Sequence, residues 1–369
     1  MQRIGILTYH AGYNFGASLQ AFALQRCIMQ FQEDCEIIRF EPMALVNQRA
    51  LFPLPPRNIR DVIKDFSRIP YYGQVMKRKE LFDCFTTETL KTSPLYRTEK
   101  EVELHATDYD CIVCGSDQIW NLDPNMSDYG SLVYFLNFPK LQRRVSYAGS
   151  FGKWVKQADT RQDEFIPWLE KFDAISVREQ SGDEYLKDKG INCQTVLDPT
   201  LLLPRSEYET IACMPDVTGD YVLVISWTCE RKLIEAAKKT AKKLNCQLLH
   251  INPPPKGMLQ GLHRKLDVGP REFLGLIQNA RLIITDSFHG TVFSTIFGKQ
   301  FFSVYTDTPD VRIQSTLRSL GMEDRMVKPN MIDGLAGQAI DYKRNRTLLE
   351  KERVSSITFL KRAIGQNAS

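Results

Sequence analysis

The sequence predicts an α/β fold with two α/β halves in one chain. Short apolar runs alternate with amphipathic helical patterns through most of the 369 residues. The alternation breaks near residues 45–105, resumes, and starts again near residue 221. With 43% hydrophobic and 25% charged residues, the composition is that of a globular protein. We therefore expect a parallel sheet in each half and a ligand cleft between the halves.

The first half begins with a predicted strand over 3–8, a loop, and a helix whose apolar residues recur at helical spacing between 17 and 31. A second strand over 36–40 completes the opening of a βαβ unit. The remaining predicted elements of this half are strands over 109–114, 145–148 and 174–177 and helices over about 161–171 and 180–188.

The second half repeats the alternation more regularly. Its predicted strands cover 221–226, 247–251, 281–285 and 301–305, and its predicted helices cover 231–245, a segment that starts at Pro270, and 290–297. The predicted domains are residues 1–200 and residues 201–341. A charged helix over 342–369 follows, and we expect it to pack back on the first domain.

Residues 45–105 form a predicted helical insertion with a local excess of positive charge. Between Val46 and Glu80 eight basic residues face three acidic ones, a net charge of +5, whereas the whole chain carries +4. Aromatic residues are mixed with these charges. The segment is therefore interpreted either as a contact with an anionic membrane surface or as a solvated helical lid.

Several classes of protein are disfavoured. A net charge of +4 is too small for a nucleic-acid-binding protein. No apolar run reaches membrane-spanning length, and the N-terminus lacks the pattern of a signal peptide. The nine cysteines are scattered, and the pair Cys111 and Cys114 lies within a predicted buried strand, so we expect reduced thiols, no metal site and a cytoplasmic protein.

His289 is the leading candidate for chemistry. It follows a strand and precedes a helix, in ITDSFHGTVF, so its side chain is expected at the carboxyl end of the sheet. Backbone N–H groups of Gly290 and Thr291 are expected to be unpaired there and to favour an anion. A histidine in this position can transfer protons near neutral pH. The alternative is a helix cap made by Asp286 or Ser287, with His289 incidental.

Other candidates follow strands of the first half. His10 lies in the first strand-to-helix loop, and Asn14 and Gly16 either form a ligand loop there or a plain turn. Asp117 follows a buried strand, where it either binds a substrate hydroxyl or caps a helix. Arg178 also follows a strand, and it either holds a carboxylate or phosphate or pairs with Glu179 or Asp183.

These segments together resemble one known family. ILTYHAGYNFGASLQAFALQ, DYDCIVCGSDQIWN, SYAGSFG, ISVREQSG, VLDPTLLL and ITDSFHGTVFSTIFGKQF occur in this order, and the chain from about residue 3 to about residue 325 is similar to the polysaccharide pyruvyl transferases. The resemblance implies a GT-B-like fold with two Rossmann-like domains facing a cleft. It also implies transfer of a pyruvyl group from phosphoenolpyruvate to two hydroxyls of a sugar, which yields a cyclic ketal.

The resemblance assigns roles to particular residues. His289 matches the catalytic histidine and Arg178 matches an arginine that holds the donor. Family members commonly carry an arginine two places before the histidine, where this chain has Ser287. Arg312 is the candidate replacement for it. With Ser287, Gly290 and Thr291, it completes the expected donor site, while His10, Asn14, Gly16 and Asp117 are expected at the acceptor.

The expected partners are a sugar or a polyprenyl-linked oligosaccharide and an anionic membrane surface at residues 46–80, without nucleic acid, metal or cofactor. The protein is then cytoplasmic, with peripheral attachment to the inner face of the membrane. Two alternatives stay open. One is a GT-B-type glycosyltransferase that uses a nucleotide sugar. The other is a non-catalytic polysaccharide-assembly protein of the same fold. The sequence leaves the oligomeric state open.

Overall fold

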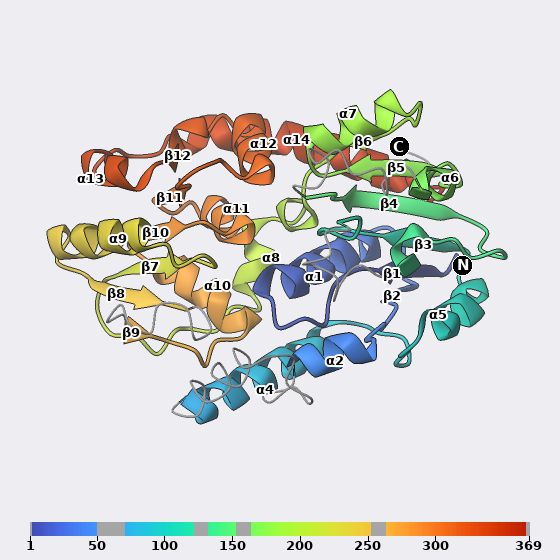
Figure 1. Ribbon diagram of the computed structural model, residues 1–369, viewed down its shortest axis with the longest axis horizontal. Helices are drawn as coiled ribbons and strands as arrows, with labels where there is room; N and C mark the ends of the chain where they lie inside the picture. Colours follow the sequence, from blue (N-terminus) through green and yellow to red (C-terminus); the bar gives the residue numbers. More distant parts are fainter. Residues whose placement is uncertain (1, 50–70, 122–131, 153–163, 252–262, 367–369) are drawn as a thin grey trace. The chain divides into compact units, whose positions relative to one another are not determined.

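The computed structural model describes residues 2–49, 71–121, 132–152, 164–251 and 263–366, which fall into two compact units. Unit 1 contains the described residues up to 49 together with Thr86–Leu203 and 349–366. Unit 2 contains 71–85 and the described part of Pro204–Leu348. Each unit holds one six-stranded sheet (Figure 1). All the pairs in both sheets are parallel, which confirms the predicted α/β class.

The sheet of unit 1 has the strand order β2-β1-β3-β4-β5-β6. Because β2 and β3 lie on opposite sides of β1, the winding reverses between β1 and β3, and such a reversal opens a crevice at the carboxyl ends of the strands. The strands are β1 (Ile4–Leu7), β2 (Cys35–Ile37), β3 (Cys111–Cys114), β4 (Arg144–Gly149), β5 (Ala174–Val177) and β6 (Gln194–Thr195).

Helix α1 (Phe15–Met29) is buried on almost every side, because its residues are mostly apolar and Gln20 satisfies its amide inside the protein. Asn14 starts the helix by accepting from the N–H groups of Gly16 and Ala17. Unit 1 also contains α2 (Met43–Arg49), α5 (Glu99–His105), α6 (Ile166–Leu169), α7 (Gln180–Asp188) and the short 3₁₀ helices η2 (Ala106–Asp108), η4 (Leu132–Phe135) and η7 (Pro199–Leu201).

The sheet of unit 2 has the order β12-β11-β10-β7-β8-β9, so its winding reverses between β7 and β10. The strands are β7 (Tyr221–Ile225), β8 (Gln247–His250), β9 (His263–Arg264), β10 (Leu282–Thr285), β11 (Phe301–Val304) and β12 (Met326–Val327). The helices are α8 (Arg205–Glu209), α9 (Arg231–Lys243), α10 (Pro270–Asn279), α11 (Phe288–Ile296), α12 (Val311–Ser319) and α13 (Ile332–Leu335), with 3₁₀ turns η9 (Glu323–Arg325) and η10 (Pro329–Met331).

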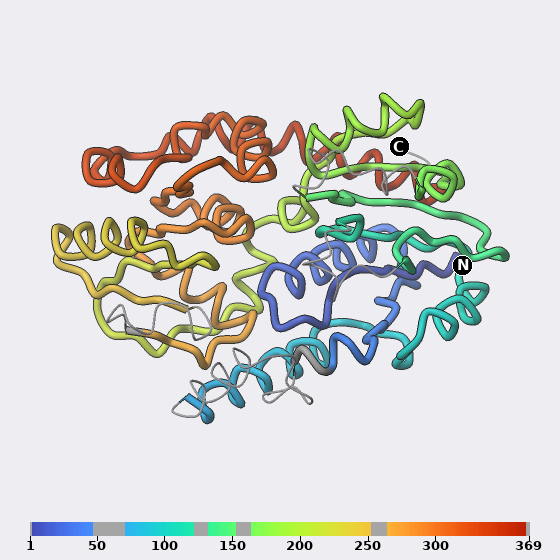
Figure 2. Tube along the Cα trace, viewed as in Figure 1, coloured from blue at the N-terminus to red at the C-terminus, as the bar shows by residue number. Residues whose placement is uncertain are grey.

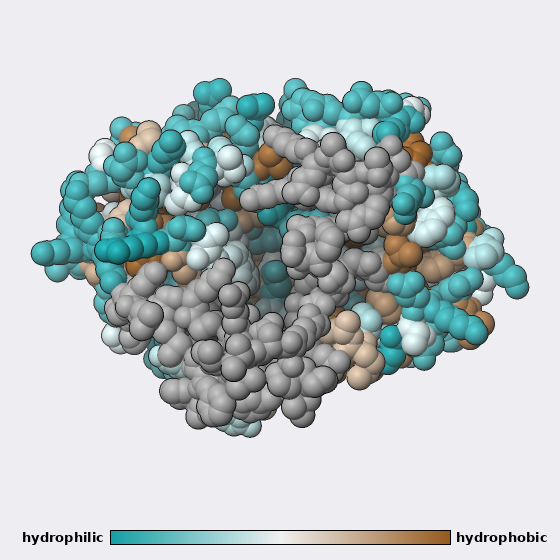
Figure 3. All heavy atoms as spheres, in the orientation of Figure 1, coloured by the Kyte–Doolittle hydropathy of each residue, from teal (hydrophilic) through white to brown (hydrophobic). Residues whose placement is uncertain are grey.

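Helix α9 shows why the spacing of apolar residues predicted a helix here. Leu233, Ile234, Ala237 and Ala241 are buried against the sheet, while the charged residues of the same helix face solvent. Its outer face belongs to the hydrophilic surface at the left of Figure 3. Among the described residues visible in that view, hydrophobic side chains appear as small, separate patches.

Two long helices contain residues of both units. Helix α4 (Tyr72–Thr89) belongs to unit 2 up to Phe85, and helix α14 (Tyr342–Ala363) belongs to unit 1 from Leu349 onward. The second part of α14 packs on unit 1, where Ser356 accepts from the N–H of Leu197 and Arg353 donates to the carbonyl of Leu201. Figure 2 shows this red end of the chain beside the green strands of unit 1.

The structure adds elements that the sequence pattern did not predict. The edge strands β6, β9 and β12 have two residues each, which is too short for a periodic signal. Within the predicted insertion, the structure describes α2, α4 and α5. The basic residues that were predicted to contact a membrane, Arg57, Arg60, Lys64 and Arg68, lie outside the described residues.

Arg78 does not belong to a solvated basic face. It is 6% exposed, donates to the carbonyl of Val268 at 3.2 Å, and lies over the ring of Phe82. Burial lowers its pKa to about 10. Arg78 is one of the eight basic residues between positions 46 and 80. Because it is buried in the packing of unit 2, it is unsuited to contact a membrane.

Candidate functional site

Arg178 lies in unit 1, directly after β5, and is 3% exposed. Its Nη1 donates to Oδ2 of Asp198 at 2.9 Å, and its Nη2 lies 3.6 Å from Oδ1 of Asp117. We call Ser116, Asp117, Arg178, Asp198 and Thr200 the Arg178 cluster. It lies at the carboxyl ends of β3 and β5, where parallel sheets commonly bind their ligands.

Hydrogen bonds fix Asp198 in this cluster. Its Oδ1 accepts from the N–H of Thr200 at 3.0 Å and from the hydroxyl at 2.6 Å, and its Oδ2 also accepts from Oγ of Ser116 at 3.3 Å. Arg178 thus contacts two carboxylates, Asp198 and Asp117, that were not among its predicted partners. Glu179 accepts from the hydroxyl of Ser150 and from the N–H of Phe151, both of which follow β4.

The loop before Asp117 approaches the backbone closely. A Cβ on Gly115 would lie 2.3 Å from the carbonyl oxygen of Tyr147, and the φ of Gly115 is +107°, so glycine is required there. The hydroxyl of Thr8 donates to the carbonyl of Ser116, and Gln20 accepts from the Ser116 N–H. The two segments that follow β1 and β3 are thereby held together at the winding reversal.

The predicted acceptor residues of the first loop have structural duties. His10 is 1% exposed, and its Nδ1 lies 3.0 Å from the carbonyl oxygen of Thr8. Asn14 is the N-cap of α1, and it receives the N–H of Gly16. Asn14 and Gly16 thus belong to the start of α1 rather than to a separate turn. Asp117, which was expected at the acceptor, lies 3.6 Å from Arg178.

His289 occupies the first turn of α11 in unit 2 and is 9% exposed. Its ring packs edge-on against Phe288, with centroids 5.0 Å apart. Ser287 caps the helix, because its Oγ accepts from the Gly290 N–H at 3.3 Å. Of the two predicted caps, the structure shows Ser287 at the N-cap position of this helix, whereas Asp286 lies one residue before it.

The expectation of unpaired N–H groups at Gly290 and Thr291 is wrong. The first is taken by the Ser287 side chain and the second by the Ser287 carbonyl at 3.0 Å, the first regular bond of the helix. The hydroxyl of Thr291 is also engaged, 2.6 Å from that of Ser303. Close packing explains the glycine at position 290, since a Cβ there would lie 2.4 Å from Oγ1 of Thr285.

Arg312, the predicted replacement for the family arginine, lies close to this corner. Its guanidinium carbon is 5.8 Å from the ring centroid of Phe288, the neighbour of His289. The same guanidinium makes a two-pronged contact with Asp310, with Nε and Nη2 at 3.0 and 2.7 Å from its two oxygens. The positive charge of Arg312 is thus largely balanced by Asp310.

Asp286 supports a loop that the sequence analysis did not single out. Its carboxylate accepts from Oγ of Ser226, from the N–H of Trp227 and from both the N–H and the hydroxyl of Thr228. This loop follows β7 at the winding reversal of unit 2 and presents Trp227, whose side chain is 40% exposed. The sequence signal that could have identified this loop is a tryptophan directly after a predicted strand.

The described residues contain no group of three or more His, Cys, Asp or Glu suited to a metal ion. Cys111 and Cys114 are both buried in β3, and burial raises the pKa of the Cys111 thiol to about 12. They are packing residues of the sheet. No helix among the described residues is long and apolar enough to cross a bilayer.

Comparisons with known proteins agree with the fold. The sequence model of the polysaccharide pyruvyl transferase family matches residues 14–308. The structure is similar to a UDP-GlcNAc 2-epimerase from Neisseria meningitidis bound to UDP-GlcNAc (TM-score 0.54, 9% identity, 98% of this chain and 100% of that chain). It also resembles a putative UDP-N-acetylglucosamine 2-epimerase from Listeria monocytogenes (TM-score 0.53, 12% identity, 95% and 90%). A search of curated protein sequences found no match.

Proposed function

Because the chain belongs to the polysaccharide pyruvyl transferase family, we propose that it transfers the pyruvyl group of phosphoenolpyruvate to two hydroxyls of one sugar during cell-surface polysaccharide synthesis. The family match carries this proposal. It is supported by a buried arginine at a strand end in unit 1 and by a histidine at a helix N-terminus in unit 2.

In the proposed reaction Arg178 binds the carboxylate or phosphate of the donor through its planar guanidinium, which Asp198 holds in place. Within unit 2, the positive end of the α11 dipole lies beside His289 and favours an anion, and Arg312 lies near the same helix start. Ser287 contributes as the cap that fixes this helix end. Asp117, 3.6 Å from Arg178, accepts a proton from an acceptor hydroxyl next to the bound donor.

The chemistry balances with one proton transferred to carbon. His289 protonates the methylene carbon of the donor, and the first sugar hydroxyl adds to C2 and loses its proton. The C2–O bond to phosphate then breaks, and the resulting oxocarbenium ion is captured by the second hydroxyl. Of the two hydroxyl protons, one balances the new methyl group and the other leaves with phosphate. Positioning and charge stabilisation supply most of the rate enhancement.

The test is phosphate release from phosphoenolpyruvate with a panel of soluble and lipid-linked sugars. We expect His289→Ala to lower turnover by about 10²–10⁴-fold while the protein stays folded. The exposed His105, which pairs with Asp108 on the surface, provides the control variant His105→Ala with unchanged turnover. Wild-type turnover in His289→Ala would remove His289 from the reaction.

A nucleotide-sugar transferase is the second candidate. It is favoured by the likeness to an epimerase bound to UDP-GlcNAc and by exposed Trp227, whose ring could stack on a base. Calorimetry with phosphoenolpyruvate and with UDP-sugars separates the two. Tight binding of a UDP-sugar that Trp227→Ala abolishes, without binding of phosphoenolpyruvate, would replace the pyruvyl donor.

We also propose that the acceptor is presented at an anionic membrane, which the basic residues Arg57, Arg60, Lys64 and Arg68 would contact. Each basic residue near such a surface contributes about 1 kcal/mol at low salt. Replacing the four by glutamine should abolish co-sedimentation with anionic liposomes and spare activity on a soluble acceptor. Equal sedimentation with neutral liposomes would leave the solvated-lid interpretation.

A further inference from the structure

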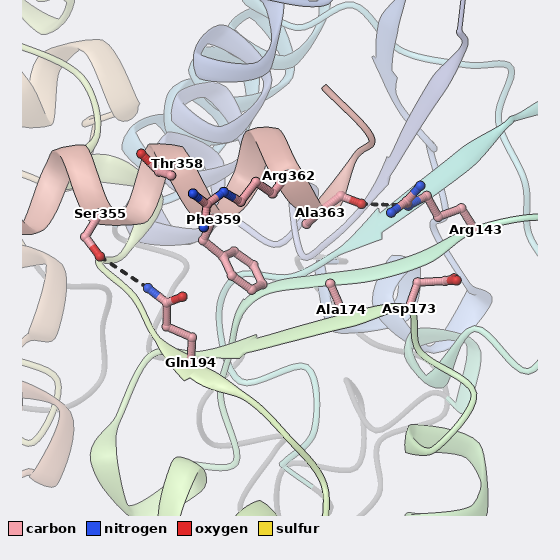
Figure 4. Close-up of a pocket in the computed structure, with 9 residues that line it drawn as sticks. All are labelled: Arg143, Asp173, Ala174, Gln194, Ser355, Thr358, Phe359, Arg362 and Ala363. Atoms are coloured by element: carbon pink, nitrogen blue, oxygen red, sulfur yellow. Dashed lines mark hydrogen bonds between the residues drawn. The ribbon is translucent and has the colours of Figure 1, made fainter. Parts of the chain in front are cut away.

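Unit 1 contains a groove that none of the residues of the Arg178 cluster line. It has a volume of about 360 Å³ and is bounded by the amino ends of β4, β5 and β6 on one side and by α14 on the other (Figure 4). Asp173 lines it just before β5, whereas Arg178 follows the carboxyl end of the same strand. At about 3.3 Å per residue the two ends are roughly 16 Å apart.

Helix α14 turns an unusual face toward this groove. Ser355, Thr358, Phe359 and Arg362 recur at the spacing i, i+3, i+4 and i+7, so they share one side of the helix. A side used only for packing would be apolar. Here it combines hydroxyls, one aromatic ring and one guanidinium, which are groups that contact a polar ligand.

The groups across from the helix are complementary. Gln194 donates to Oγ of Ser355 at 3.2 Å, and Figure 4 shows this pair at one end of the groove with Phe359 directed toward the sheet. At the other end Arg143 donates through Nε to the carbonyl of Ala363 at 2.7 Å. That bond anchors the last turn of α14 and fixes the Arg143 guanidinium in the wall.

The charges favour an anion that is carried on a larger polar molecule. Arg143 and Arg362 contribute two positive charges against one carboxylate, Asp173, which already accepts from the N–H of Arg144 at 2.8 Å. Arg362 is exposed, so its guanidinium is accessible to a ligand. The ring of Phe359 is half-buried, 6.5 Å from Tyr147, and offers an apolar surface beside the hydroxyl-binding groups.

We propose that this groove is a second carbohydrate site that binds a sugar carrying a carboxylate. Arg362 and Arg143 would contact the carboxylate, Gln194, Ser355 and Thr358 the hydroxyls, and Phe359 the apolar face of the ring. The inference rests on the proposed function, because a pyruvyl ketal keeps the carboxylate of the donor and the product is therefore an acidic sugar. The site would hold an already modified unit of the polymer while transfer proceeds elsewhere.

The test measures binding rather than turnover. Calorimetry compares a methyl galactoside pyruvate ketal, a methyl glucuronide, neutral methyl galactoside and inorganic phosphate on the full chain. We expect both acidic sugars to bind, with Arg362→Gln weakening them about tenfold or more because a charge-assisted pair is lost. Arg346→Gln changes the same charge on an exposed residue of α14 outside the groove and should bind as the wild type does.

Two further variants separate this site from the transfer site. Binding should persist in His289→Ala, and Phe359→Leu should weaken sugars without affecting phosphate. Equal binding of the neutral galactoside, displacement of the sugars by phosphate at the same concentration, or wild-type affinity in Arg362→Gln would each overturn the proposal. Failure of phosphate release from phosphoenolpyruvate would instead refute the transfer reaction, and binding of the glucuronide would still report on the groove.

Discussion

Arg178 has a structural duty besides its proposed role in donor binding. Its guanidinium and the carboxylate of Asp198 are both almost fully buried and contact each other at 2.9 Å. Removal of one member of such a pair leaves a buried charge without its partner, which costs more than the pair itself contributes. A loss of activity in an Arg178 variant therefore has to be separated from a loss of folding.

We expect Arg178→Ala to lower the free energy of unfolding by about 3–5 kcal/mol, since Asp198 keeps a buried carboxylate. Arg178→Lys should recover most of this stability but little donor affinity, because lysine lacks the planar fork. Urea unfolding and the donor KM measure the two effects. Arg231→Ala, which breaks an exposed pair with Glu235, is the control and should leave both unchanged. An Arg178→Ala protein as stable as the wild type would contradict the structural duty.

His250 makes stability depend on pH. Complete burial at the end of β8, with Arg264 as a secondary cause, lowers its pKa from 6.5 to about 4. The unfolded chain therefore binds the proton first as the pH falls, so stability is lost between pH 6.5 and 4. From the two pKa values, the loss at pH 5 is about 2 kcal/mol.

The measurement is the free energy of unfolding at pH 7 and pH 5 for the wild type and for His250→Gln. Carboxyl groups contribute equally to both proteins, so the difference between the two pH dependences isolates His250. The variant should lose about 2 kcal/mol less than the wild type. Identical pH dependences would show that His250 is not held neutral.

At the scale of elements, the corner between β10 and α11 combines a cap with a close approach. The hydroxyl of Ser287 caps the helix that bears His289. Gly290 then allows α11 to lie against Thr285 of β10.

Gly290→Ala should destabilise unit 2 by about 1–3 kcal/mol, because its Cβ would lie 2.4 Å from Oγ1 of Thr285 and the helix would have to shift. Such a shift would also move His289 and lower turnover. Gly334→Ala is the matched control, since its Cβ would have no neighbour within 4 Å. Thermal unfolding of both variants checks the expectation, and equal melting temperatures would refute the packing argument.

At the scale of the whole molecule, the described chain leaves unit 1 after Leu203 and returns to it at Leu349. The returning segment buries Leu360 and Ile364 completely and is tied to the sheet through Ser356 and Arg353. The stability of unit 1 thus depends on a segment that begins more than 140 residues after Leu203 in the sequence.

Leu360→Ala should cost about 2–5 kcal/mol, and the loss should appear in unit 1. Hydrogen exchange resolved by peptide measures it: amides of β1, β3 and β4 should exchange faster, whereas those of β7 and β10 should keep their protection. Val354→Ala, at a position that is 58% exposed on the same helix, is the control. Faster exchange confined to β7 and β10 would contradict the assignment of this segment to unit 1.

The sequence by itself determined the α/β class, the long strands and helices, and the position of His289 and Arg178 at strand ends. These depend on local hydrophobic periodicity and on the order of motifs, which each segment carries alone. Ser287 as a cap was also readable, because a serine three residues before the N–H that it accepts is a local pattern.

Only the tertiary structure decided which partner each polar group has. Arg178 contacts Asp198, which is 20 residues away in the sequence, and Arg78 donates to the carbonyl of Val268, which is 190 residues away. The groove at Arg362 brings helix α14 beside the strand that starts at Ala174. Such contacts leave no periodic trace in the sequence. They arise because burying a charge or a polar group requires a partner in space, and the fold alone determines which one is near.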